Sequence, residues 1–250
     1  MRALRILLIV VVVLGGLFVA ADRIAVGFAE DKAADQLRTS EGLSSKPDVS
    51  IKGFPFLTQV ASGSLDDVQI GIKDYDAATS VGSGDGKGPD KIRIDELTAE
   101  MRGVAFSGDY SSATADTASG TARISYAELL KAAQVEPVQV APGVTANVVG
   151  LSDGGNGKIK VEVEATVLGK KLAEPVSVLS SARVEGDVVK VDADALPKLG
   201  VPVAENRVRS ITDFQQKITG LPAGIQLGTV EAAPDGVNVS VKGSDVRLVG

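Results

Sequence analysis

The stretch Val49–Ile72 constrains the fold of this chain more than any other. It begins with apolar and polar residues in alternation, the period-2 pattern of a half-buried strand. The alternation stops at Pro55, which has no backbone N–H to donate to a central ladder position. It then resumes in a second run, at Val68, Ile70 and Ile72. We therefore predict two strands joined by a kink, and the kink presents Phe54 and Phe56.

Phe54 and Phe56 allow two interpretations. They are two of only six phenylalanines in the chain, and they either anchor a core where a sheet turns or line the mouth of an apolar cavity. Residues two apart in a regular strand face the same side, so we predict that both rings point inward. They should then lie beside Ile70 and Ile72 and opposite a helix such as Ile211–Ile218.

The amino-acid composition excludes several classes of function. The chain has 250 residues and no Cys, which rules out disulfides, thiolate zinc sites and a lipid-modified cysteine anchor. It also has no His, so Ser-His-Asp catalysis is impossible and the commonest metal ligand is missing. The net charge of −6 argues against a nucleic-acid partner, because phosphate binding needs clustered Lys and Arg. We therefore expect no cofactor, no metal site and no enzymatic activity.

Residues 1–21 are expected to target the chain to a membrane or to anchor it there. Arg2 and Arg5 precede the sixteen uncharged residues Ile6–Ala21, which as a helix would span about 24 Å, less than the roughly 30 Å of a hydrocarbon core. One alternative is a signal peptide cleaved near Ala21. The other is a short uncleaved anchor, with Arg5 reaching to the headgroups. In both cases the arginines place the N-terminus in the cytoplasm and the rest of the chain outside.

The segment Asp22–Leu37 follows as an amphipathic helix. Its apolar residues recur about every four positions, at Ile24, Phe28, Ala33 and Leu37. We predict that this face packs against a sheet rather than on a membrane surface, because the polar face is not basic. If the first segment stays uncleaved, the two segments form one long helix.

Beyond these helices the chain consists of strands joined by short turns, which predicts a mostly antiparallel sheet of about nine or ten strands. The clearest strand is Ile159–Val167, where apolar residues alternate with Lys, Glu and Thr. A capping-box pattern at Ser125–Glu128 predicts a short helix. Apolar residues spaced 3, 3 and 4 apart predict another helix over Val208–Ile218.

Two polar stretches interrupt the strand pattern. Tyr75–Asp90 is rich in Gly, Ser and Asp and is expected to be a flexible loop. Ser107–Gly120 is a second polar run, mostly Ser, Thr, Ala and Asp. No change of composition marks a second domain, so we expect residues 22–250 to form a single domain.

Three patterns resemble functional motifs but fail in detail. Asp153–Glu164 has acidic residues at both ends of a twelve-residue window, but Lys158 stands where an EF-hand loop needs Gly, so a hairpin turn is the better interpretation. Asp192 and Asp194 resemble the paired carboxylates of glycoside hydrolases, yet they alternate with apolar residues and should lie on a wet face. Gly82–Gly88 lacks the spacing of a nucleotide-binding P-loop.

The central stretch also carries a resemblance to a known family. GFPFLTQ at Gly53–Gln59, followed by G-x-L-x-x-V at Gly63–Val68, resembles the LmeA-like phospholipid-binding family of actinobacterial envelope proteins. The similarity continues in weaker form along the chain, including Gly220–Pro222 and Asp235–Val237. It implies an α+β fold like that of the tubular lipid-binding superfamily. In that fold a long curved antiparallel sheet wraps around one or two helices with an apolar tunnel between them, here preceded by an N-terminal hydrophobic helix.

The same resemblance implies non-catalytic phospholipid binding at the outer face of the plasma membrane, in support of envelope lipid or lipoglycan assembly. The expected partners are the plasma membrane and a phospholipid such as phosphatidylinositol or its mannosides, and the chain is expected to be a monomer. One alternative is a membrane-anchored structural or interaction module with a solid core, and another is a hydrolase that uses only carboxylates and Ser. The residues expected to line the lipid site, all apolar, are Phe54, Phe56, Leu57, Ile70, Ile72, Ile211, Phe214 and Ile218.

Overall fold

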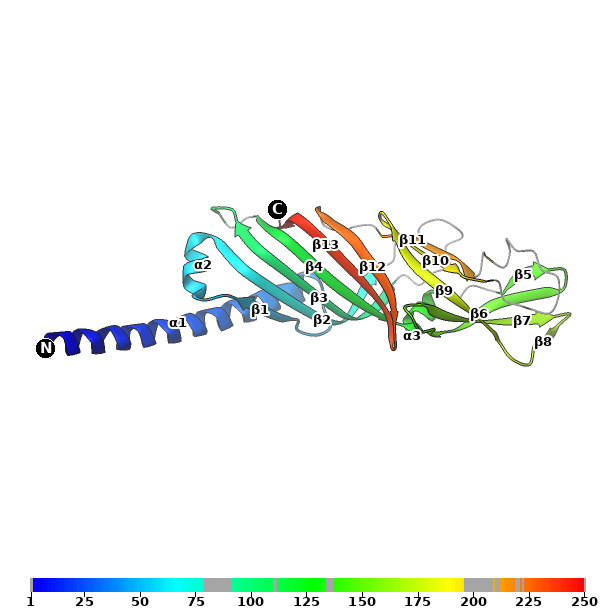
Figure 1. The fold of residues 1–250 in the computed structure, drawn as a ribbon, viewed down its shortest axis with the longest axis horizontal. Coiled ribbons are helices and arrows are strands. Elements are labelled where there is room, and N and C mark those ends of the chain that lie inside the picture. The colour runs from blue at the N-terminus through cyan, green and yellow to red at the C-terminus, as the bar shows by residue number, and fades with distance from the viewer. Residues whose placement is uncertain are drawn as a thin grey trace.

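The computed structural model describes residues 2–78, 91–109, 112–133, 137–195, 209, 212–218, 221 and 223–249. The fold is α+β: within these residues, helices α1–α3 accompany two antiparallel sheets that lie end to end in an elongated molecule (Figure 1). The curled antiparallel sheet and the long N-terminal helix confirm the fold class predicted from the sequence.

Helix α1 (Arg2–Ser40) is one continuous helix. Its first half is exposed and projects away from the rest of the molecule (Figure 1). By length and composition α1 could cross a membrane. Its second half packs on the body of the protein, where Asp22, Val26 and Ala34 are buried.

The packing face predicted for α1 was wrong in its first half, whereas Ala33 and Leu37 of the same face are half-buried. Ile24 and Phe28 were expected at this interface, but they are 74% and 65% exposed. The contact is made instead by Val26, with Ala25 and Ala29 beside it. Alanines let the helix backbone approach the strands more closely than Ile or Phe would, so the face with small side chains is the one that packs densely.

The first sheet has six strands in the order β1-β2-β3-β4-β13-β12, with every neighbouring pair antiparallel. Its strands are β1 (Asp48–Lys52), β2 (Ser64–Ala78), β3 (Lys91–Phe106), β4 (Ala113–Ser125), β12 (Ile225–Ala233) and β13 (Gly236–Val249). Helix α2 (Phe56–Ser62) connects β1 to β2, and α1 lies against β1 and α2. The two strands predicted around Pro55 are thus confirmed as β1 and β2.

The second sheet has seven strands in the order β11-β10-β9-β7-β6-β5, with β8 paired to β7. Its strands are β5 (Val138–Ala141), β6 (Val144–Asp153), β7 (Ile159–Val167), β8 (Lys170–Lys171), β9 (Val176–Glu185), β10 (Val188–Ala193) and β11 (Phe214–Lys217). Helix α3 (Tyr126–Ala133) follows β4 and packs on β6 as well as on β3 and β4. Because β12 also contacts β9, the two sheets meet at this junction.

Several local predictions are confirmed. Ile159–Val167 is strand β7, in which buried and half-buried residues alternate as expected. Asp153–Gly157 forms the turn of the β6–β7 hairpin, and the capping-box segment opens α3. The expected loop Tyr75–Asp90 was wrong at its start, because Tyr75–Ala78 is the end of strand β2; residues 79–90 lie outside the described residues.

The predicted helix Val208–Ile218 was wrong in its second half. Phe214–Lys217 is strand β11, which pairs with Val188–Val191 of β10. Three or four apolar residues at helical spacing are a weak signal, and the hydrogen-bonded pairing with β10 outweighs it. Of the apolar residues that carried the prediction, Val208 and Ile211 lie outside the described residues.

Candidate functional site

The kink between β1 and β2 is a short helix. Phe56 begins α2, and Gly63 ends it in the left-handed conformation with a φ of 76°, which glycine adopts without steric cost. Gln59 is buried in α2 and joins both flanking strands. Its amide nitrogen donates to the Lys52 carbonyl at 3.4 Å, and its side-chain oxygen accepts from the Asp66 N–H at 2.7 Å. Helix α2 is therefore fixed to the sheet.

The two phenylalanines do not share a face, which corrects the prediction that both point inward. Phe56 is 7% exposed and packs in a cluster with Val26 and Leu65. Phe54 is 57% exposed, and Leu57 is 37% exposed. The rule that residues two apart share a side applies within a strand, whereas Phe56 already belongs to a helix.

Asp22 ties α1 to α2, and no sequence pattern pointed to it. Its side chain is fully buried, and its carboxylate accepts a hydrogen bond from the Leu57 N–H at 2.8 Å. Arg23 forms an ion pair with the same carboxylate at 2.5 Å, and its guanidinium lies 5.2 Å from the centre of the Phe54 ring. One of the N–H groups left without a partner at the start of α2 is thereby satisfied. The exposed, apolar half of α1 therefore ends where α2 is attached.

The six-stranded sheet has an apolar face whose middle is only half-buried. Cross-strand pairing aligns its side chains in rows, one of which joins Ile70 of β2 to Ala99 of β3, and the next Ile72 to Leu97. We call "the apolar face" the side chains of Val49, Ile70, Ile72, Leu97, Ala99, Ala122, Val239 and Val241. Val49 is buried, and all the others are half-buried.

The core of the seven-stranded sheet contains more fully buried side chains than the apolar face does. Its inward side chains include Val140 and Val163, both 0% exposed, and Ala165, which is 1% exposed. They form one cluster with Tyr126 of α3 and Val230 of β12, so other parts of the protein cover them. Half-buried apolar side chains such as Val189 and Val191 surround this cluster, and Val239 of the apolar face packs against it. The apolar face has only one fully buried member, Val49, so among the described residues it is the better candidate for ligand contact.

The residues predicted from the sequence to line a site fall on both sheets. Ile70 and Ile72 lie together on the apolar face of the six-stranded sheet. Ile218 follows β11, and its N–H donates to the carbonyl of Asp187 at 2.8 Å, so it lies beside the β9–β10 turn of the seven-stranded sheet. Phe214 begins β11 of that same sheet.

A hollow of about 750 Å³ lies on the opposite, polar face of the six-stranded sheet. Its walls carry hydroxyl, amide and charged side chains, among them Gln69, Thr98 and Lys242. Adjacent residues in a strand point to opposite faces, so Gln69 and Thr98 point away from the side of Ile70 and Ala99. Ile70, Ala99 and Val241 also border the hollow, but most of its lining residues carry polar or charged side chains, so the apolar face is the better candidate for acyl chains.

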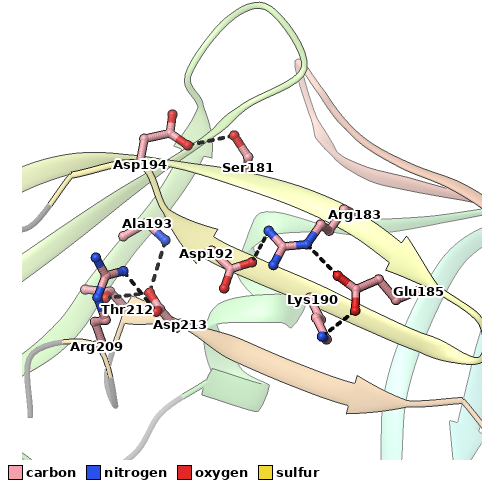
Figure 2. Close-up of polar contacts among 10 residues, drawn as sticks. All are labelled: Ser181, Arg183, Glu185, Lys190, Asp192, Ala193, Asp194, Arg209, Thr212 and Asp213. Atoms are coloured by element: carbon pink, nitrogen blue, oxygen red, sulfur yellow. Dashed lines mark hydrogen bonds and ion pairs between the residues drawn. The ribbon is translucent and has the colours of Figure 1, made fainter. Parts of the chain in front are cut away.

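Figure 2 shows charged groups around the β9–β10 hairpin of the seven-stranded sheet. Asp192 forms an ion pair with Arg183 at 2.6 Å, and Asp194 forms one with Lys158 at 2.5 Å. Hydrogen bonds from Lys158 and from Ser181 lower the pKa of Asp194, whereas the general acid of a glycoside hydrolase needs a raised pKa. Asp194 therefore lacks the raised pKa of a general acid, and both carboxylates are held in ion pairs. Within the described ranges, no cluster of acidic side chains is arranged to hold a metal ion.

A model of the LmeA-like phospholipid-binding family matches residues 20–242 of the chain. The chain belongs to this family. The match takes in Asp22, α2 and the strands of both sheets from β1 into β13, which confirms the resemblance first seen in the GFPFLTQ segment. Membership in the LmeA-like family supports lipid binding by this chain. A search of the curated proteins and a search of the solved structures each gave no match.

Proposed function

We propose that the chain binds a phospholipid without catalysing a reaction, and that the acyl chains lie on the apolar face of the six-stranded sheet. The observation that carries this proposal is the half-buried state of Ile70, Ile72 and their neighbours, in a chain that belongs to a phospholipid-binding family. Each methylene moved from water into apolar surroundings contributes about 0.8 kcal/mol. An aliphatic surface left partly open by its own protein therefore favours an acyl chain as its cover.

Ile70 and Ile72 are the contact residues best supported by the geometry. Phe56 packs in the cluster that continues this surface toward α2, with Val68 and Met101 beside it. A lipid on the apolar face would therefore extend toward the α2 end of the sheet. Its headgroup would remain near that end, outside the apolar face.

We also propose that the chain stays anchored at the outer face of the plasma membrane. Helix α1 continues without a break past Ala21, where a signal peptide would be cleaved, and the next residue, Asp22, is buried against α2. Both observations favour an uncleaved anchor, with Arg2 and Arg5 on the cytoplasmic side. At this location a monomer that binds phosphatidylinositol or its mannosides would support the assembly of envelope lipids or lipoglycans.

The substitution Ala99→Phe tests the proposed site. Ala99 is half-buried in the middle of the apolar face, so a phenyl group there would occupy the space assigned to acyl chains without adding a polar group. Ala105→Phe is the matched control, because Ala105 lies on the same strand and is exposed. Lipids extracted from each purified full-length protein would be measured by mass spectrometry.

We expect the bound phospholipid to fall several-fold in Ala99→Phe and to stay at the wild-type level in Ala105→Phe. Equal phospholipid content in the two variants would contradict the assignment of the apolar face. A wild-type protein that carries no phospholipid would favour the alternative, an anchored structural module with a solid core.

A further inference from the structure

An apolar surface lies around the point where α1 leaves the body of the protein, with the half-exposed Arg23 guanidinium beside its Phe54 ring. Residues 53–65 contain no charged side chain. Three of their large apolar side chains are exposed, Phe54 by 57% and both Leu57 and Val60 by 37%. On α1 itself, Ile24 is 74% exposed. We call these four residues, Phe54, Leu57, Val60 and Ile24, the apolar collar.

The apolar collar lies on two sides of α1 at one height. The Leu57 N–H donates to the Asp22 carboxylate, so α2 is attached at the level of Asp22. A helix turns about 100° per residue, so Ile24, two residues further on, points about 200° away from Asp22, to the opposite side. Figure 1 shows α2 running crosswise to α1, at the end of the six-stranded sheet from which the free half of α1 projects. A plane drawn across α1 at this level would meet the collar on both sides.

The length of the apolar half of α1 indicates where a bilayer surface would cross the helix. Ile6–Ala21 covers about 24 Å, which is about 6 Å less than a hydrocarbon core of roughly 30 Å. Four more helical residues, Asp22–Ala25, make up the difference, and this is the level of the collar. The charges of Asp22 and Arg23 in this interval are paired with each other, and Asp22 is buried against α2.

We propose that the apolar collar inserts into the outer leaflet of the bilayer that α1 spans. This inference rests on the proposed membrane anchoring. The occupant is lipid because the collar lies where the exposed apolar half of α1 meets the body of the protein, and because residues 53–65 contain no charged side chain with which a protein partner could pair. Insertion would hold the α2 end of the six-stranded sheet at the bilayer, so that a phospholipid reaches the apolar face without crossing water.

Single-cysteine variants of the full-length chain test this proposal, since the chain has no native Cys. Leu57→Cys places an environment-sensitive fluorophore in the collar. Leu168→Cys is the matched control, because Leu168 is 83% exposed in the turn between β7 and β8, at the far end of the molecule (Figure 1). Both labelled proteins would be reconstituted into phosphatidylcholine vesicles that contain nitroxide-labelled phosphatidylcholine.

We expect blue-shifted emission and several-fold stronger nitroxide quenching for Leu57→Cys than for Leu168→Cys. Ile24→Cys, on the other side of α1, should behave like Leu57→Cys. Equal emission and quenching at Leu57 and Leu168 would overturn the proposal. Quenching at Leu57 that appears only when phosphatidylglycerol is added would also overturn it, because apolar insertion does not depend on anionic headgroups.

The phospholipid content of the same purified protein separates this inference from the proposed function. If no phospholipid co-purifies while Leu57→Cys is quenched, the proposed lipid binding on the apolar face is contradicted and the proposed insertion of the collar is supported. If phospholipid co-purifies and Leu57→Cys is not quenched, the collar fails and the lipid site stands.

Discussion

Replacing Phe56 or Phe54 by alanine should separate a core residue from a surface residue two positions away. Phe56 is 7% exposed inside an apolar cluster, so Phe56→Ala should lower the free energy of unfolding by about 3–5 kcal/mol. Burying a whole phenylalanine contributes about 1.5–3 kcal/mol, and Phe54, 57% exposed, retains less than half of that, about 1 kcal/mol. Its contact with Arg23 adds about 0.5–1 kcal/mol. Phe54→Ala should therefore cost only about 1–2 kcal/mol.

Thermal unfolding of the full-length proteins in detergent micelles would measure this difference, followed by far-UV circular dichroism because the chain has no Trp. At this chain length, 1 kcal/mol shifts Tm by about 2–4 °C, so Phe56→Ala should lower Tm by about 6–20 °C and Phe54→Ala by about 2–8 °C. A loss for Phe54→Ala as large as that for Phe56→Ala would refute the reasoning. The amount of phospholipid bound to the folded Phe56→Ala protein tests whether Phe56 contacts the lipid. Unchanged binding would show that Phe56 is not part of the lipid site.

Tyr126→Phe should cost about 0.5–1.5 kcal/mol, because it removes the hydrogen bond that the hydroxyl donates to the Ala233 carbonyl at 2.8 Å. Burial raises the pKa of Tyr126, so this residue should ionise at a higher pH than an exposed tyrosine. An absorbance titration of the wild type should show this high-pH step, and Tyr126→Phe should lack it. A hydrogen bond from Lys190 lowers the pKa of Glu185, so the stability that Glu185 contributes is complete above its unfolded-state pKa of about 4.3 and is lost as pH falls through the lower folded-state value. Lys190→Met should therefore make Tm fall less steeply on the acid side, and an unchanged slope would contradict this pairing. Residues 22–250 alone should keep a cooperative thermal transition, because every described strand lies beyond the first segment, and the absence of a transition would contradict the predicted domain boundary.

Sequence patterns predicted the elements in which one face is dry and the other wet. In Ile159–Val167 and Asp48–Lys52, the residue types themselves alternate, so the strand and its buried side can be predicted from the chain alone. The long helix α1 was predictable for a similar reason, because an uncharged run leads directly into an amphipathic one. Its packing face was not predictable, because side-chain size rather than polarity decided which side contacts the sheet.

Strand β4 shows why other elements could not be predicted. Its inward residues are small, such as Ala113, Ala115 and Ala118, and the residues between them are Thr114, Asp116 and Thr117, so the contrast in hydrophobicity is weak. Asp116 and Thr117 are both exposed, and the alternation slips by one residue there. The strand is determined by its two neighbours, β3 and β13, which pair with it from both sides. Such pairing is a property of the whole sheet and leaves little mark on the local sequence.

The candidate site was predictable in kind but not in extent. The family resemblance and the alternation around Ile70 and Ile72 pointed to an apolar sheet face in a lipid-binding chain. The same alternation occurs in Ile159–Val167, whose side chains are closed off by α3 and β12. A sheet face becomes a buried core when segments distant in the sequence cover it. Local sequence patterns do not predict that cover. The role of Asp22 is hidden in the same way, because its partner, the Leu57 N–H, lies 35 residues away.

The rotation of α1 about its own axis links the proposed lipid site to the proposed membrane contact. With Ala25 and Ala29 turned inward, the helix sits close against β1 and α2, at the edge of the six-stranded sheet. The middle of the apolar face then stays half-buried. The same rotation turns Ile24 and Phe28 outward, Ile24 at the height where the apolar half of α1 would leave a bilayer. Had these larger side chains faced the sheet, they would have filled part of the surface assigned to acyl chains and removed apolar area from the membrane side. The small residues on one side of α1 thus leave the proposed lipid site open, and a large residue on the other side, Ile24, supplies part of the proposed membrane contact.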